Sequence, residues 1–204
     1  MAFLRSIRPE EDLELIRGRT LILRQPAASD YAEWAELRAL SRAHLTPWEP
    51  TWSADDLARS MYRRRLRAYA KDMRDDISYP YFIFDIATGH LLGGITLSNV
   101  RRGSAQSASL GYWMGAPHAG QGRMKEAVAA LLPVTFGALR LHRIEAATML
   151  ANFASIRVLE ASGFEREGLS RSYLKINGRW EDHLLFGRVA GAPQSTVLLL
   201  GGGS

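Results

Sequence analysis

Apolar residues follow one another, or alternate with polar residues, in seven short segments of the chain. A repeat of two places successive side chains on opposite faces and is typical of β-strands, and glycine, proline or asparagine bounds most of these segments. The strands are expected at 20–26, 81–86, 91–100, 107–115 and 142–149, followed by a hairpin over 173–189. The hairpin turn is predicted at Asn177-Gly178, because Asn-Gly favours the positive φ angles of a two-residue turn.

Helical spacing of apolar residues fills the intervals between these strands. The first helix is expected over 29–40, where Asp30 and Glu33 have the spacing of a capping box. The second is expected to begin at Ser53, because acidic residues then occupy its first turn, where they interact favourably with the positive end of the helix dipole. The remaining helices are expected over 120–137, where Pro133 should kink or shorten the helix, and over 152–163.

The order of these elements predicts an α/β (α+β) fold with a mixed central sheet of about seven strands and about four flanking helices. No repeat or linker divides the chain, so we expect an N-terminal segment over 1–19, one domain over 20–189 and a disordered tail over 190–204.

Composition limits the possible functions. The chain of 204 residues has no cysteine, which excludes disulfides, a thiolate nucleophile and cysteine-based metal sites. It has neither a long apolar run nor a signal-peptide pattern, so a cytoplasmic location without membrane attachment is expected. The net charge of +5 is carried mostly by arginine. The run Arg63–Arg67 indicates either a solvated helix face or a surface for nucleic acid.

A glycine-rich turn, "GAPHAGQGRMKEAV" over 115–128, leads directly into the third predicted helix. It matches neither the Walker loop, which needs Gly-Lys-Ser/Thr, nor the dinucleotide motif, which needs glycine where Lys125 stands. The turn still favours an anion, because the first four N–H groups of a helix lack internal partners and the positive dipole end lies there. Gly120 and Gly122 would let a phosphate approach these N–H groups.

Three segments together carry a family resemblance: "LGYWMGAPHAGQGRMKEAV", "LHRIEAATMLANFASIRVLEASGFEREG" and "YLKINGRWEDHLL". They resemble the acetyl-CoA-binding core of the GNAT acetyltransferase superfamily, and in particular its ribosomal-protein alanine N-acetyltransferase (RimJ/RimL-type) branch. The resemblance covers about 20–189 and includes "PWEP" over 47–50. The superfamily motif [RQ]-x-x-G-x-[GA] is altered here, since Ala119 and Met124 stand at its two ends. Met is common at the second position in this branch.

The resemblance implies a GNAT fold whose sheet is splayed between the fourth and fifth strands, with acetyl-CoA in the cleft and no metal. The backbone of Tyr112, Trp113 and Met114 would pair with the pantetheine arm. An N–H near Met114 would polarise the thioester carbonyl. The resemblance assigns the pyrophosphate to Gly120, Gln121, Gly122, Arg123, Met124 and Lys125. Asn152 would contact the pantetheine or cap its helix, and Arg157 would lie near the adenosine or in solvent.

Direct attack of an amine on the thioester requires a proton acceptor for the amine and a proton donor for the leaving thiolate. Ser155 is the predicted donor. Glu49 is the predicted acceptor, and Glu145 is the second choice. Trp48, Tyr112 and Tyr173 are expected around the acceptor, although burial in the core is the alternative for each. His142 and His183 are expected to be structural, with His183 at the acceptor end as the alternative.

The acceptor is expected to be the N-terminal α-amine of a protein such as a ribosomal protein, with transient ribosome contact. A small amine, such as an antibiotic, a polyamine or an amino acid, is the alternative. Two further alternatives keep the same fold without acetyl transfer: a basic nucleic-acid-binding protein and an inactive CoA-binding protein. The oligomeric state, monomer or homodimer, stays open.

Overall fold

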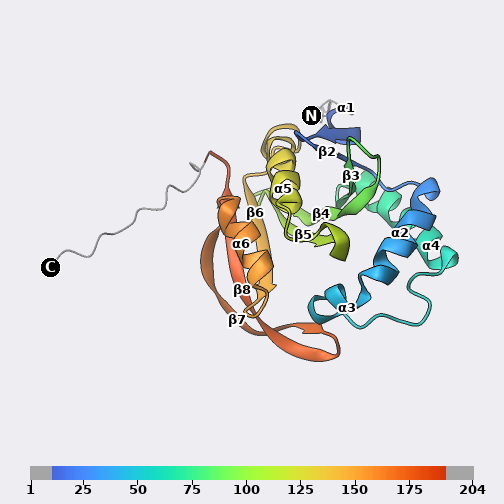
Figure 1. Ribbon diagram of the computed structural model, residues 1–204. Coiled ribbons are helices and arrows are strands. Elements are labelled where there is room, and N and C mark those ends of the chain that lie inside the picture. The colour runs from blue at the N-terminus through green and yellow to red at the C-terminus, as the bar shows by residue number, and fades with distance from the viewer. Residues whose placement is uncertain (1–10, 192–204) are drawn as a thin grey trace.

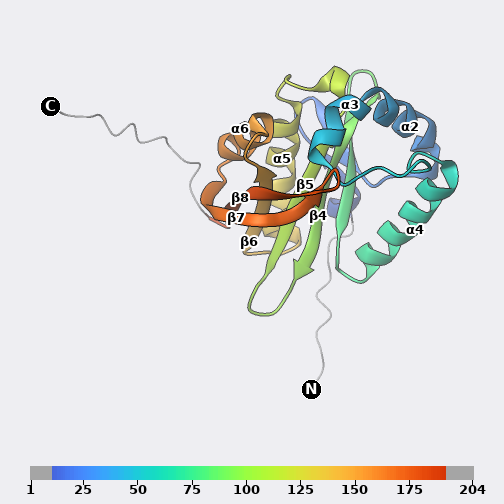
Figure 2. The same cartoon turned by 90° about the horizontal axis from the view of Figure 1, so that it is seen from below.

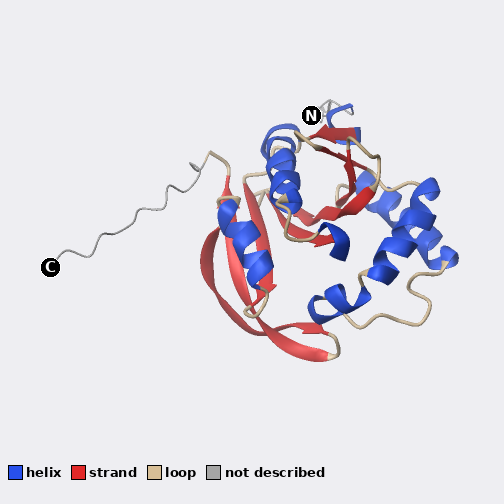
Figure 3. Ribbon diagram, viewed as in Figure 1, coloured by secondary structure: helices blue, strands red, loops and turns tan. Residues whose placement is uncertain are grey.

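The chain folds around one mixed β-sheet with helices on both of its faces (Figures 1 and 3). The computed structural model describes residues 11–191. Eight strands lie in the order β1-β2-β3-β4-β5-β6-β8-β7. All neighbouring strands are antiparallel except β5 and β6, which are parallel. This one parallel contact divides the sheet into two antiparallel parts.

The strands occupy all seven predicted segments and add one more. Their bounds are β1 Leu15–Arg17, β2 Leu21–Arg24, β3 Tyr79–Asp85, β4 Leu91–Arg101, β5 Ser107–Met114, β6 Arg143–Met149, β7 Glu165–Ile176 and β8 Arg179–Val189. β1 was not predicted, because three residues are too few to show an alternating pattern. It pairs with β2, so part of the segment assigned to 1–19 belongs to the domain.

The four longer helices occupy the four predicted helical segments. The helices are α1 Glu11–Glu14, α2 Tyr31–Leu40, α3 Arg42–Leu45, α4 Arg59–Arg74, α5 Arg123–Pro133 and α6 Phe153–Ala161. Pro133 ends α5, and a π-helical turn, Val134–Ala138, follows it. No helix in the described part of the chain is long and apolar enough to cross a membrane. The predicted tail lies almost entirely outside the described residues.

One predicted helix start and one predicted side-chain cap were wrong, for the same physical reason. α4 begins at Arg59 rather than Ser53, because the carboxylates of Asp55 and Asp56 accept hydrogen bonds from Ser53 and stabilise a turn. Asp30 does not cap α2 with its side chain. Its carboxylate accepts the N–H of Ala27 and two bonds from Arg24 instead. Short acidic side chains compete for backbone donors wherever the chain bends, and spacing alone does not show which donor they take.

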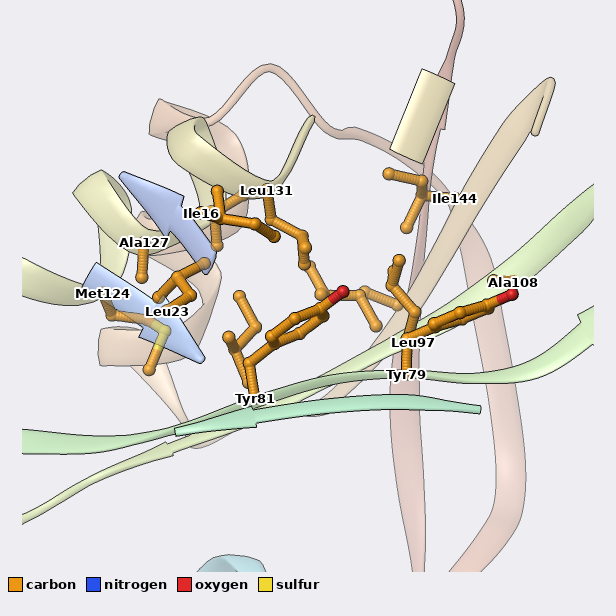
Figure 4. Packing of buried hydrophobic residues seen from close by; sticks show 14 of the residues in the cluster. Ile16, Leu23, Tyr79, Tyr81, Leu97, Ala108, Met124, Ala127, Leu131 and Ile144 are labelled. Atoms are coloured by element: carbon orange, nitrogen blue, oxygen red, sulfur yellow. The ribbon is translucent and has the colours of Figure 1, made fainter. Parts of the chain in front are cut away.

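Both faces of the sheet centre are buried, which explains why β3 is apolar at nearly every position. Tyr81 and Ile83 join a core cluster with α5, in which Met124, Ala127 and Leu131 pack (Figure 4). The alternate residues Phe82 and Phe84 face a second cluster. That second cluster contains Trp34 of α2 and Tyr62 of α4, which lie on the other side of the sheet from α5 (Figure 2). The sheet is thus held from both sides at the strands next to the parallel contact.

Candidate active site between β5 and β6

The parallel contact between β5 and β6 is short, and the two strands separate beyond it. Ser107, Ala108 and Ser109 pair with 143–145, and no pairing continues along Leu110–Met114. Each strand keeps its other neighbour, β4 or β8, so only the edges that face each other are open. We call this gap the fork. A cavity of about 880 Å³ occupies it and is lined by residues of both strands, the α5 loop, α6 and the α3 region.

The loop before α5 forms one end of the cavity. Gly120 and Gly122 have φ angles of +74° and +75°, and a Cβ on either glycine would meet no protein atom within 4 Å. Gly122 is the N-cap residue of α5 and provides no side chain to cap it, and the first N–H bonded back into the helix is that of Glu126. The preceding N–H groups therefore retain their capacity to bind an anion.

The basic side chains of this loop have different surroundings. Lys125 lines the cavity. Arg123 instead pairs with Asp85 at 2.9 Å and donates to the Thr20 hydroxyl. The Thr88 N–H, and to a lesser degree the Arg123 guanidinium, keep the pKa of Asp85 below its usual value. The Arg123 guanidinium thus anchors α5 to the sheet. The backbone N–H of Arg123 is still available to a ligand.

The side chains of two other predicted cofactor residues pack in the core. The side chain of Met124 is in the core and 7% of the residue is exposed. The ring of Trp113 meets Phe82 edge-on, with 6.5 Å between centroids, in the second core cluster. Gln121 donates its side-chain amide to the Pro117 carbonyl. Met114 and the exposed Arg157 line the cavity, as do the other predicted cofactor residues except Gln121.

A pair of hydroxyl groups lies inside the fork. The Tyr112 hydroxyl is 2.9 Å from Ser155 Oγ, and either group can be the donor. Burial raises the pKa of Tyr112 to about 12, partly offset by the Ser155 contact, so the phenol stays protonated at neutral pH. Asn152 accepts the Ser155 N–H at 3.1 Å and is the N-cap of α6. Two chain-distant segments therefore place two O–H groups side by side at the cavity wall.

The opposite wall carries Trp48 and Glu49, just after α3. Both carboxylate oxygens of Glu49 accept from Arg38 at 2.7 Å, and the Trp52 indole N–H donates to one of them at 2.8 Å. Arg38 is 8% exposed and lies over the Trp52 ring at 4.2 Å. Both oxygens of the carboxylate that was predicted to accept the proton are therefore engaged by hydrogen bonds. Glu49 is the partner of a buried cation, and protonating it would leave that cation unpaired.

Two further predicted residues lie away from the cavity lining. Glu145 pairs with Arg101 and Arg143 at the closed end of the fork. Tyr173 is 47% exposed on β7 and contacts the cavity only through His183, at 5.8 Å between ring centroids. Sequence reasoning did not find Arg38, whose partner is eleven residues away. It also treated His183 mainly as structural, although His183 is a cavity residue.

The hairpin of β7 and β8 reaches across to the α3 region (Figure 1). The Asn177 N–H, at its turn, donates to the Glu49 carbonyl at 2.9 Å. The hairpin turn and the Glu49 segment thus meet at one side of the cavity. No group of side chains suited to hold a metal ion occurs in the described part of the chain.

Comparisons with known proteins agree with this geometry. The model of the acetyltransferase (GNAT) domain family matches residues 20–165. A probable N-acetyltransferase of Bacillus subtilis, YjcK, is 35% identical over 83% of this chain and 93% of its own. The [ribosomal protein uS5]-alanine N-acetyltransferase of Escherichia coli is 33% identical over 81% of this chain and 85% of its own.

The solved structure of Mycobacterium smegmatis RimJ in complex with CoA-disulfide superposes with a TM-score of 0.80 at 34% identity. The match covers 87% of this chain and 85% of the RimJ chain. The matched family region contains the fork, the α5 loop and the Ser155 segment. The chain belongs to the GNAT family of acetyltransferases and is an acetyl-CoA-dependent N-acetyltransferase.

Proposed function

We propose that this enzyme transfers the acetyl group of acetyl-CoA to the N-terminal α-amine of a protein, by direct attack of the amine on the thioester. The observation that carries the proposal is the fork, which brings exposed backbone N–H groups, an open strand edge and two hydroxyls to one cavity. The relatives with ribosomal-protein names support a protein acceptor.

The donor is held mainly by backbone groups in this proposal. The pyrophosphate lies against the N–H groups of 120–125, and Lys125 supplies positive charge. The pantetheine amides pair with the open edge of β5 at Tyr112–Met114. Asn152 and Arg157 line the path of the arm at the start of α6. An N–H near Met114 then stabilises the oxyanion that forms on the thioester carbonyl.

Ser155 protonates the departing sulfur. Its Oγ has the Tyr112 hydroxyl at 2.9 Å, so a proton given up by Ser155 can be replaced from the phenol. The high pKa of Tyr112 keeps that phenol neutral and able to donate. No covalent acyl-enzyme is needed, because the chain contains no cysteine and the amine can attack the thioester directly.

An α-amine suits this site on chemical grounds. With a pKa of about 7.7–8.0, roughly a quarter of such amines are neutral near pH 7.4, whereas a lysine side chain is neutral about once in a thousand molecules. The wall of Trp48 offers an apolar surface for the first residues of a peptide. A small-molecule amine is the alternative acceptor, and it would need no contacts outside the cavity.

A basic face on α4 provides a contact for a ribosomal substrate. This helix has seven cationic residues and one acidic residue, a net charge of +6, whereas the whole chain has +5. Arg59 and Arg65 lie over aromatic rings, and Lys71 pairs with Asp75. Arg63, Arg64 and Arg67 are exposed and have no carboxylate partner in the described part of the chain. They favour a polyanionic surface such as ribosomal RNA.

The test is acetylation of peptides that begin with alanine, with a thiol-release assay and mass spectrometry of the product. A matched peptide with a blocked N-terminus and one internal lysine is the control. We expect acetylation at the α-amine only. Turnover of small amines together with inert peptides would instead favour the alternative acceptor.

The α4 contact is tested separately, with small ribosomal subunits as the substrate. Replacement of Arg63, Arg64 and Arg67 by glutamine should weaken ribosome binding and its salt dependence, while the peptide rate stays the same. Equal ribosome binding by the variant would exclude this face.

A further inference from the structure

His183 lies at the acceptor side of the fork, in the middle of three strands. It is on β8, opposite Met149 of β6 and Ser170 of β7. The residue is only 3% exposed, yet it lines the cavity. Its ring is therefore shielded by the protein on most sides and borders the cavity on another.

One hydrogen bond determines which ring nitrogen carries the proton. His183 Nδ1 lies 2.9 Å from the Glu181 carbonyl oxygen. A carbonyl oxygen can only accept, so Nδ1 carries the hydrogen and, in the neutral ring, Nε2 holds a lone pair. Nε2 is not among the buried polar atoms without a partner in the described residues. Because no described group forms a hydrogen bond with Nε2, part of this atom's surface remains accessible, and the residue to which it belongs lines the cavity.

The other candidate bases are less suitable. Glu49 is the one carboxylate among the described residues that line the cavity, and it is held by Arg38 and Trp52. His44 lines the cavity too, but it is exposed on α3, and no contact fixes its ring within the described chain. His118 lies beside the α5 loop, at the donor end.

We infer that His183 is the catalytic residue that accepts the proton of the entering ammonium group, with Nε2 as the acceptor atom. The inference rests on the proposed function, because it assumes an amine acceptor in the fork. An ammonium group gives one proton to His183 Nε2 and becomes a neutral amine. The nitrogen lone pair then forms the bond to the thioester carbon, and the carbon–sulfur bond breaks.

The remaining protons balance. The departing sulfur takes a proton from the Ser155–Tyr112 hydroxyl pair, and the second proton of the former ammonium restores that pair. The products are the amide, the free thiol of CoA and a protonated His183, which releases its proton to solvent. No oxidant, metal or further reactant is required.

The surroundings of His183 suit this role. From β7, Tyr173 meets the ring edge-on at 5.8 Å, and from β6 the facing residue is the uncharged Met149. On β8 itself, Glu181 contributes its carbonyl, and the Asp182 carboxylate is occupied by the Ser172 N–H. Across the cavity are the paired Glu49 and the exposed His44. The Glu181 side chain is on the same face of β8 but is not among the residues that line the cavity, and no ion pair joins His183 to a carboxylate in the described part of the chain.

The decisive variant is His183→Asn. An asparagine amide can still donate to the Glu181 carbonyl, but it has no basic nitrogen. With an alanine-initiated peptide at pH 6.5, we expect kcat/KM to fall about 100-fold, the range of general base catalysis. At pH 8.5, where about four-fifths of α-amines are already neutral in water, the loss should narrow to about tenfold or less. Acetyl-CoA affinity should remain within twofold.

The matched control is His142→Asn, at an exposed histidine outside the cavity, and it should leave the rate unchanged. His44→Asn tests the rival base, and a pH-dependent loss there instead of at His183 would overturn the inference. A loss at His183 that is equal at both pH values would also overturn it, since that would indicate a purely structural role. If His183→Asn fails to bind acetyl-CoA, His183→Gln is assayed by the same comparison. Absence of activity in the unaltered enzyme would instead reject the proposed function.

Discussion

The glycines before α5 allow a test that separates backbone strain from ligand binding. Gly122 and Gly103 both have positive φ angles, +75° and +66°, and a Cβ on either would meet no protein atom within 4 Å. Gly103 lies in the turn between β4 and β5, at the opposite end of β5 from Met114. Alanine at either position therefore introduces strain without a steric clash, but only Gly122 is next to the proposed phosphate site.

The expected magnitudes differ in a way that can be measured. A non-glycine residue in the left-handed region costs about 1–2 kcal/mol. For a chain of this size each kcal/mol lowers the melting temperature by about 2–4 °C, so both variants should melt a few degrees lower. The Gly122→Ala methyl group also projects to where a phosphate oxygen would meet the helix N–H groups. Loss of one charge-assisted hydrogen bond, about 1.5–3 kcal/mol, weakens the CoA Kd about 10- to 150-fold.

The assay is isothermal titration of CoA into each variant, with melting curves of the same samples. We expect similar melting temperatures for Gly122→Ala and Gly103→Ala, and a weakened Kd for Gly122→Ala alone. Equal CoA affinity in the two variants would refute the reasoning that the N–H groups of this loop hold the pyrophosphate.

Three more predictions concern Ser155, Glu49 and Asp85. Ser155→Ala should lower kcat about 10- to 100-fold and leave CoA affinity within twofold, and wild-type turnover would remove Ser155 from the mechanism. Glu49→Gln should lower the free energy of unfolding by about 2 kcal/mol, because the buried Arg38 loses its charge partner, and should reduce activity by one factor at every pH. A loss that grows at low pH would show that Glu49 is the base after all. Asp85 has a depressed pKa in the folded state, so its stabilising contribution is present above its ordinary pKa and is lost as pH falls through the lower folded value. Asp85→Asn should therefore flatten the acid side of the curve of melting temperature against pH below about pH 4, and an unchanged curve would contradict the lowered pKa of Asp85.

Features encoded by neighbouring residues could be predicted from the sequence. The strand at 81–86 and the turn at Asn177-Gly178 were predicted from local patterns, and the structure contains both, with the strand at 79–85. The glycines at 120 and 122 were expected to form an anion-binding turn, and their φ angles are those that only glycine adopts easily. The separation of β5 from β6 came from the family resemblance and was not visible in the periodicity.

Features that depend on distant residues could not be predicted. The ion pair of Arg38 with Glu49 joins two segments whose approach is set by how α2 packs on the sheet. The position of His183 depends on pairing with β6 and on a β7 strand with two register shifts. The alternation of apolar and polar residues in the sequence predicts neither the pairing nor the shifts. For the same reason Glu145 was a reasonable candidate base, until its two arginine partners were located on β4 and β6.

The open edges of β5 and β6 affect how the substrate specificity of such an enzyme can change in evolution. Main-chain groups keep their positions whatever side chains the strands carry. The half of the site that is proposed to bind acetyl-CoA therefore tolerates amino-acid substitutions. The proposed acceptor half is different, because it is built from the tip of a hairpin and a loop after α3, which a backbone hydrogen bond joins. Replacing those two surface segments would change the acceptor specificity, while the same strands would still bind the coenzyme.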